Sequence, residues 1–176
     1  MAKETATLAG GCFWCTEAIF KHLMGVEKVT SGYAGGKMEN PSYDKVSQGS
    51  TGHAEAIQVE FNPKIITYEK LLEVFFKLHD PTTLNQQDAD VGTQYRSAIF
   101  YHDKKQKEVA EKVKNQMQPL YKNRVATEIV PLTHFYPAEE IHQDYYAKNP
   151  SSAYCQVVID PKIKKLLTEF KESVKD

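Results

Sequence analysis

Two cysteines, Cys12 and Cys15, follow a glycine pair near the start of the chain. The glycines allow a sharp turn, and the apolar spacing after them predicts a helix that begins at Cys12. At a helix N-terminus, unpaired backbone N–H groups and the helix dipole favour a thiolate. We therefore expect Cys12 to have a low pKa and to act as a nucleophile. Cysteine is often only a small buried hydrophobic residue, but the glycine turn and the aromatic residues after Cys12 argue against that interpretation.

Cys15 lies one helical turn after Cys12, so both side chains share a helix face. A disulfide needs Cβ atoms about 3.8 Å apart, closer than the regular helix spacing of about 5–6 Å, so the first turn would have to yield. The pair could also be half of a zinc site or a thioredoxin-like redox pair. Zinc is disfavoured because no second Cys-x-x-Cys or paired His motif completes four ligands. Spacing alone leaves the thioredoxin-like pair open.

Cys155, the third cysteine, ends the turn-rich segment Asn149-Pro-Ser-Ser-Ala-Tyr-Cys155 near the C-terminus. A thiol in such a segment is expected to be mobile enough to reach another site, which suits a resolving cysteine. It can equally be an incidental cysteine at a surface or strand edge.

Glu55 occupies an unusual position in a predicted strand. It shares the strand face of Ile57, Val59 and Phe61, which should be the core side. A carboxyl group on an apolar face is desolvated and its pKa rises, which makes it a proton donor near neutral pH. The alternative is a strand-end carboxylate that turns out to water.

Polar side chains in or beside two long predicted loops, over residues 35–52 and 80–94, complete the candidate site. Tyr43, Tyr95, Asp90 and His53 could hydrogen-bond a polar substrate atom. Each is a weak signal by itself, since the chain has 10 tyrosines.

The elements that must position these residues are mixed rather than regularly alternating. Apolar periodicity, caps and breakers predict an α+β fold, a mixed sheet with helices packed on it. We expect strands at 5–9, 26–34, 55–61, 95–101, 127–132 and 156–159, and helices at 12–23, 68–79, 104–117 and 138–148 and from 161 onward.

Size and charge restrict the classes of function. The 176 residues with 41% hydrophobic content suit a single domain over 1–176, and 22 Lys and Arg balance 23 Asp and Glu. This balance predicts no binding to nucleic acid or to an anionic membrane. The first eight residues lack the apolar segment of a leader, and an odd number of cysteines fits a reducing compartment, so we expect a cytoplasmic protein.

The segment Gly10-Gly-Cys-Phe-Trp-Cys-Thr-Glu17 resembles the nucleophile motif of the A-type peptide methionine sulfoxide reductases. Further segments resemble blocks of that family in the same order, between about residues 8 and 159, so a chance match is improbable. These segments are Ser31-Gly-Tyr-Ala-Gly-Gly36, Asn40-Pro-Ser-Tyr43, Gly49-Ser-Thr-Gly-His-Ala-Glu55, His79-Asp-Pro81, Asp90-Val-Gly-Thr-Gln-Tyr-Arg-Ser97, Phe135-Tyr136, Ala138-Glu-Glu-Ile-His-Gln-Asp-Tyr-Tyr146, Asn149-Pro150 and Tyr154-Cys155.

The resemblance implies a two-layer, ferredoxin-like α+β domain that reduces the S epimer of methionine sulfoxide, free or in oxidised proteins. It implies electrons from thioredoxin and neither a metal nor an organic cofactor, and we expect a monomer. By the matching motifs, Cys12 would be the nucleophile and Glu55 the proton donor to the sulfoxide oxygen. Tyr43 and Tyr95 would hydrogen-bond that oxygen, and Asp90 would orient substrate or water. Phe13 and Trp14 would hold the substrate's methyl group.

Cys15 departs from the family pattern, in which many members have glycine. After attack, the Cys12 sulfenic acid would condense with a second thiol to a disulfide that an external dithiol reopens. Either Cys15 or Cys155 could supply that thiol. Our hypothesis is a relay in which the disulfide ends at Cys155, where it reaches thioredoxin.

Two other functions are consistent with parts of the sequence. A general thiol-disulfide oxidoreductase based on Cys12 and Cys15 would exchange disulfides but would not explain Glu55 or the tyrosines. An oxidation sensor could bind oxidised methionine partners through Trp14 without turnover.

Overall fold

A six-stranded sheet organises the structure, a computed structural model that describes residues 3–176. Met1 and Ala2, part of the segment searched for a leader, lie outside the described residues. The strand order is β7-β6-β1-β3-β2-β8, with β6 and β7 parallel and the other neighbours antiparallel. The strands are β1 (Glu4–Gly10), β2 (Val26–Ala34), β3 (Ala54–Phe61), β6 (Ser97–Tyr101), β7 (Glu128–Pro131) and β8 (Phe135–Pro137).

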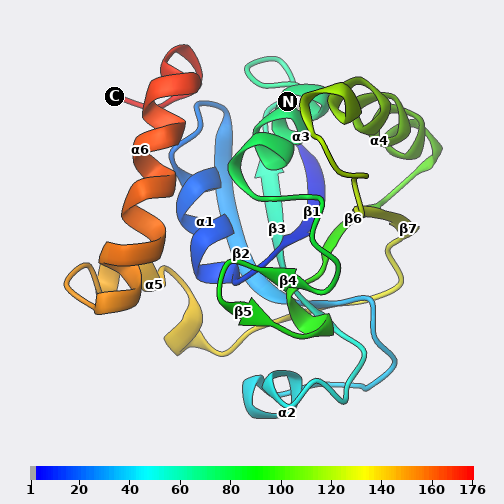
Figure 1. Cartoon of the computed structure of the whole chain (residues 1–176), viewed down its shortest axis with the longest axis vertical. Coiled ribbons are helices and arrows are strands. Elements are labelled where there is room, and N and C mark those ends of the chain that lie inside the picture. Colours follow the sequence, from blue (N-terminus) through cyan, green and yellow to red (C-terminus); the bar gives the residue numbers. More distant parts are fainter. Residues whose placement is uncertain (1–2) are drawn as a thin grey trace.

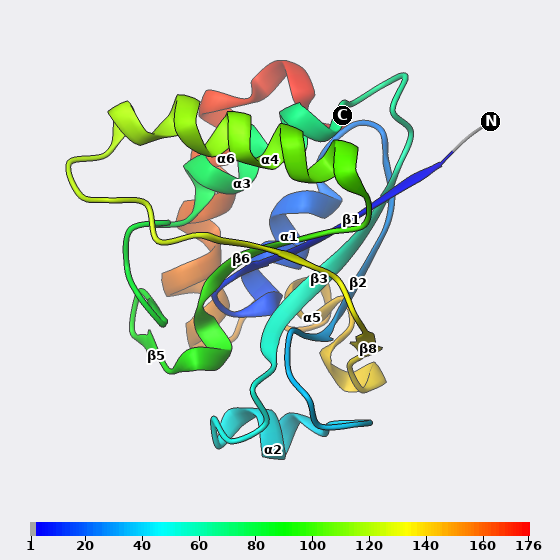
Figure 2. The ribbon, with the colours of Figure 1, turned by 90° about the vertical axis from the view of Figure 1, so that its right-hand side faces the viewer.

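Four helices pack on one face of this sheet, as Figure 2 shows. They are α1 (Phe13–Lys21), α3 (Tyr68–Leu78), α4 (Lys104–Met117) and α6 (Asp160–Glu169). Two short helices, α2 (Tyr43–Ser47) and α5 (Tyr145–Lys148), lie in the connections, and the strands β4 (Gln86–Gln87) and β5 (Asp90–Val91) form a small separate hairpin (Figure 1). The expected mixed sheet with helices packed on it is therefore confirmed.

Residue alternation in β3 explains why one sheet face carries the core. Ile57, Val59 and Phe61 are buried against the helices, while Ala54 and Ala56 belong to a smaller alanine-rich cluster on the opposite face. Because side chains alternate along a strand, Glu55 points toward the helices with the odd-numbered residues.

Side-chain caps define the starts of two helices, α3 and α4. The side chain of Thr67 accepts a hydrogen bond from the Lys70 N–H group, and Asp103 does the same for Gln106. These bonds satisfy N–H groups that have no partner within the helix.

Several expected elements are wrong. Residues 138–148 do not form one helix but a 3₁₀ turn (Glu140–His142) and α5, separated by Asp144 in the left-handed conformation with φ 57°. Residues 156–159 are not a strand, because Cys155–Ile159 form a π-helical turn that runs into α6. The last helix, expected from 161 onward, begins earlier, since helical structure precedes Asp160.

The two predicted loops contain short structure that the sequence did not indicate. Helix α2 lies within 35–52, and the β4–β5 hairpin lies within 80–94. Strand β8 was also missed, and Tyr95 belongs to a 3₁₀ turn (Thr93–Tyr95) rather than to β6. Within residues 3–176, no helix combines the length and apolarity of a membrane span.

Candidate active site

Cys12 lies where β1 passes into α1. Gly11 turns the chain with φ 95°, and a Cβ atom at this position would lie 2.6 Å from Cγ of Gln87 in the β4–β5 hairpin. Glycine is thus required both for the backbone angle and for the close approach. The Cys12 carbonyl accepts hydrogen bonds from the N–H groups of Cys15 and Thr16, and the residue is 8% exposed.

Glu55 is buried beside the start of α1, with 1% exposure, so the solvent-exposed alternative does not apply. Its Oε1 accepts a hydrogen bond of 3.0 Å from the backbone N–H of Phe13. The pKa of the Glu55 carboxyl is raised to about 8, chiefly by burial and to a smaller extent by Asp90 and Cys15, while that hydrogen bond lowers it. Glu55 is therefore protonated at neutral pH, as its strand position predicts.

The expected low pKa of Cys12 is wrong. Burial raises the pKa of this thiol well above its ordinary value, and the Cys15 thiol and Glu55 add to that effect. The physical reason is that Glu55 and Cys12 compete for the same backbone N–H group at the start of α1. The Phe13 N–H group, which could have stabilised a thiolate, is bound to Glu55 instead. Cys12 and Glu55 are thus both uncharged in the resting site.

Cys15 has the opposite tendency. It is 2% exposed, and the neighbouring Cys12 thiol lowers its pKa despite burial. The Lys162 ammonium group on α6 lowers the pKa further. Sγ of Cys15 lies 3.6 Å from the hydroxyl oxygen of Tyr154, and that hydroxyl donates a 2.9 Å hydrogen bond to Oδ2 of Asp90.

Tyr43 and Tyr95 are partly buried and lie within the influence of the same charges. Burial raises the pKa of Tyr43 to about 12, and Glu55 and Cys12 contribute to the rise. The pKa of Tyr95 is also raised by burial, then by Glu55 and Asp90. Both phenols therefore remain protonated hydrogen-bond donors beside Glu55.

A cluster of aromatic side chains surrounds the first turn of α1. Phe13 is fully buried, whereas Trp14 is partly exposed and stacks on Tyr145 with ring centres 3.7 Å apart and planes 7° apart. The Trp14 indole N–H donates to Nδ1 of His142 at 3.3 Å, and Tyr154 meets the indole edge-on at 5.6 Å. The structure thus gives Trp14 a fixed orientation at the site.

Sequence reasoning missed several residues that build this cluster. Tyr145 and His142 were read as part of a helix, and Tyr154 as part of a mobile turn. Glu139 was also missed: its carboxylate accepts hydrogen bonds from the Tyr33 hydroxyl and the Tyr43 backbone N–H. These residues lie in segments that matched family blocks, which was the available signal.

Cys155 and His53 lie outside this constellation. Cys155 is 0% exposed within the π-helical turn, and its N–H group donates to Oγ of Ser152. Turns and a bend occupy residues 150–152 as expected, but Cys155 itself is buried in the helical segment that follows them. His53 binds the backbone of Gly36 and Met38 and so stabilises the loop before β3. Over the described part of the chain, no group of three or more His, Cys, Asp and Glu side chains has the arrangement of a metal site.

Comparisons with known proteins show which proteins this chain is similar to. The sequence profile of the family described as peptide methionine sulfoxide reductase matches residues 4–174. The peptide methionine sulfoxide reductase MsrA of Thermus thermophilus is 53% identical over 171 residues, which cover 97% of each chain. The reduced form of Mxr1 from Saccharomyces cerevisiae is 42% identical with a TM-score of 0.80, over 87% of this chain and 89% of that chain. Mxr1 in complex with Trx2 is 34% identical with a TM-score of 0.57, over 81% and 84%.

Proposed function

The chain belongs to the family of peptide methionine sulfoxide reductases, and from this premise we propose how its own residues carry out the reaction. The enzyme reduces methionine sulfoxide to methionine in the repair of oxidised proteins, with thioredoxin as reductant. The observation that carries the mechanism is the buried Glu55 carboxyl group, which accepts a hydrogen bond from the backbone N–H of Phe13, the residue after Cys12. Its raised pKa keeps it protonated at neutral pH.

Glu55 donates its proton to the sulfoxide oxygen, which makes the sulfur electrophilic, and Cys12 attacks that sulfur. The attack forms an S–S bond between Cys12 and the substrate sulfur. The oxygen then passes from the substrate sulfur to the Cys12 sulfur, the substrate's S–O bond and the S–S bond break, methionine leaves, and Cys12 becomes a sulfenic acid. The proton of the Cys12 thiol ends on Glu55, so the carboxyl group is protonated again. Tyr43 and Tyr95 hydrogen-bond the oxygen during the transfer, and Asp90 orients substrate or water.

The substrate's methyl group binds against Phe13 and Trp14. Tyr145 supports this role because its ring stacks on one face of the Trp14 indole. The position of this apolar surface relative to Glu55 selects the S epimer of methionine sulfoxide, free or within a protein.

Cys15 is the thiol that closes the disulfide with the Cys12 sulfenic acid. Its support is its position one helical turn after Cys12, together with the lowered pKa of its thiol, whereas the burial of Cys155 speaks against a direct attack by that residue. A relay that ends at Cys155 requires the π-helical turn to open. Thioredoxin-dependent turnover separates the routes: Cys155→Ser should retain turnover and Cys15→Ser should lose it. The reverse result would establish Cys155 as the resolving cysteine.

The remaining features of the proposal concern architecture and surroundings. The unit β1-α1-β2-β3-α3-β6 has the strand order β6-β1-β3-β2, which supports a ferredoxin-like two-layer arrangement within a single domain. We further propose a cytoplasmic monomer that uses no metal or organic cofactor and binds no nucleic acid. The charge balance supports the last point, the odd number of cysteines supports a reducing compartment, and membership of the family supports a reaction without a cofactor.

A single-turnover experiment without reductant tests the function. Reduced protein is mixed with the separated S and R epimers of a methionine sulfoxide peptide, and the methionine formed and thiols lost are counted. We expect one methionine per chain from the S epimer only, with loss of two thiols. No methionine from either epimer, with Cys12 reduced and accessible, would contradict the proposal.

A further inference from the structure

The hydroxyl group of Tyr154 lies between a thiol and a carboxylate. Its oxygen is 3.6 Å from Sγ of Cys15, and the hydroxyl donates its proton to Oδ2 of Asp90 at 2.9 Å. A phenol has a single proton. Because that proton is on the Asp90 side, Cys15 must be the donor in its contact with Tyr154. The three groups form a directed chain from S–H through O–H to a carboxylate.

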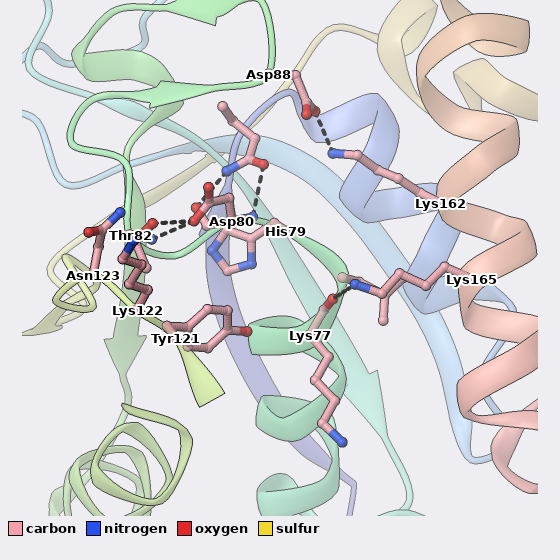
Figure 3. A pocket seen from close by; sticks show the side chains of 12 residues that line it. Lys77, His79, Asp80, Thr82, Asp88, Tyr121, Lys122, Asn123, Lys162 and Lys165 are labelled. Carbon is pink, nitrogen blue, oxygen red and sulfur yellow. Dashed lines mark hydrogen bonds and ion pairs between the residues drawn. The ribbon is translucent and has the colours of Figure 1, made fainter. Parts of the chain in front are cut away.

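Contacts outside this hydrogen-bond chain hold Tyr154 and Asp90 in place. Asp90 belongs to the β4–β5 hairpin, and Tyr154 belongs to the helical segment that continues into α6. An ion pair of 2.8 Å between Asp88 of the hairpin and Lys162 of α6 joins the two elements (Figure 3). The Gln87 side chain also bonds the N–H and the carbonyl of Asp80. The hairpin and the helix therefore keep Asp90 and Tyr154 at hydrogen-bond distance.

We propose that Tyr154 and Asp90 form the proton path that deprotonates Cys15 as this residue closes the disulfide with Cys12. The inference rests on the proposed role of Cys15 as the resolving thiol. The Cys15 proton passes to Tyr154 while the Tyr154 proton passes to Asp90. Cys15 sulfur attacks Cys12 sulfur, the S–O bond of the sulfenic acid breaks, and the departing hydroxide takes a proton from Glu55 to leave as water. Asp90 then holds the proton that Glu55 has lost.

The charges around Cys15 are consistent with this transfer. Cys12 and Lys162 favour the developing thiolate by lowering the pKa of Cys15, while burial and Asp88 oppose it. His79 lines a small cavity with Cys15, but burial lowers its pKa to about 4, so it is uncharged and does not compete for the proton. Burial also raises the pKa of Tyr154 far above its ordinary value. Tyr154 thus remains a phenol and passes on one proton as it accepts another.

The test is a single turnover of the full-length reduced protein with a methionine-S-sulfoxide peptide between pH 6 and pH 9. Methionine, trapped sulfenic acid and disulfide are quantified separately by quenching at successive times. For Tyr154→Phe we expect one methionine per chain, persistence of the sulfenic acid, and disulfide formation about 100-fold slower at pH 7. The deficit should shrink with increasing pH, because Cys15 then loses its proton to solvent. Asp90→Asn should slow disulfide formation in the same direction.

Tyr146→Phe is the matched control, because its hydroxyl contacts Asp160 rather than a thiol. It should form the disulfide at the parent rate. Disulfide formation in Tyr154→Phe at the parent rate and with the parent pH profile would overturn the proton path alone. A parent protein that forms no methionine, or a Cys15→Ser variant that still loses two thiols, would instead overturn the proposed function and this inference with it.

Discussion

Two carboxyl groups flank the first turn of α1, and they differ in surroundings. Glu55 is buried on the core face of β3 and is bound to a backbone N–H. Asp90 is partly exposed on a short hairpin and accepts a hydrogen bond from the Tyr154 hydroxyl. Burial makes Glu55 a proton donor, while the Tyr154 bond marks Asp90 as a proton acceptor. Environment, rather than residue type, divides acid from base here.

The two thiols repeat this division. Cys12 has a raised pKa and performs the step that needs an acid; with Glu55, Tyr43 and Tyr95 it forms what we call the Glu55 side of the site. Cys15 has a lowered pKa and performs the step that needs a base; with Tyr154, Asp90 and Lys162 it forms the Asp90 side. One turn of helix thus joins two half-reactions with opposite proton requirements. Substitution of Tyr154 or Lys162 should therefore affect disulfide formation and spare methionine formation.

The largest effect should come from the cysteines themselves. Cys12→Ser should form no methionine, because a hydroxyl group cannot replace the thiol that takes the oxygen. Cys15→Ser should form one methionine per chain and no disulfide with Cys12. Quantification of methionine and free thiols after one turnover distinguishes the two. Disulfide formation in Cys15→Ser at the parent rate would contradict the division.

Glu55→Gln should slow methionine formation by about 100-fold or more, because the amide cannot protonate the sulfoxide oxygen. In the parent protein, Glu55 is protonated below its pKa of about 8. The single-turnover rate of methionine formation should therefore be flat below pH 8 and fall as pH rises above it. Glu55→Gln should lack this decrease. A parent profile that rises through pH 8 would show that the protonated carboxyl group is not the required form.

Tyr43→Phe and Tyr95→Phe should each slow methionine formation by about tenfold, the effect of losing one hydrogen bond of about 1.4 kcal/mol in the transition state. Both phenols lie on the Glu55 side. Stopped-flow measurement of the two half-reactions should show disulfide formation at the parent rate. An equal slowing of both steps would indicate a general distortion of the site instead.

Lys162→Met should have the smallest effect, a decrease of about threefold in disulfide formation, because Cys12, the larger influence that lowers the Cys15 pKa, stays in place. The substitution removes the ammonium group that favours the Cys15 thiolate while it retains an unbranched side chain. Methionine formation should not change. Lys164→Met, which changes an exposed lysine on the same helix, is the control. A large effect on methionine formation would show that Lys162 serves the Glu55 side as well.

The sequence could predict the Glu55 side because its determinants are local. The glycine pair, the alternation of β3 and the caps of α3 and α4 each depend on residues within a few positions. Burial of Glu55 followed directly from its parity with Ile57 and Val59.

The Asp90 side could not be predicted in the same way, because distant contacts determine it. The left-handed Asp144 that interrupts residues 138–148 donates its N–H to the Glu17 carboxylate, 127 positions away. The β-branched run after Cys155 suggested a strand, which would place Val157 on the face of Cys155 and Ile159. Instead Val157 is 72% exposed, and Cys155, Ile159 and Ile163 are buried at helical spacing. Packing against α1 and neighbouring elements outweighs the strand propensity here.

Trp14, stacked on Tyr145 and edge-on to Tyr154, is the only tryptophan of the chain. Its consequence is optical. Indole fluorescence from this protein arises solely at the active site, within reach of the groups that change during the cycle. Substrate entry, sulfenic acid formation and disulfide closure each alter the surroundings of this ring. The enzyme therefore carries an intrinsic fluorescent reporter of its own turnover, with no label to attach.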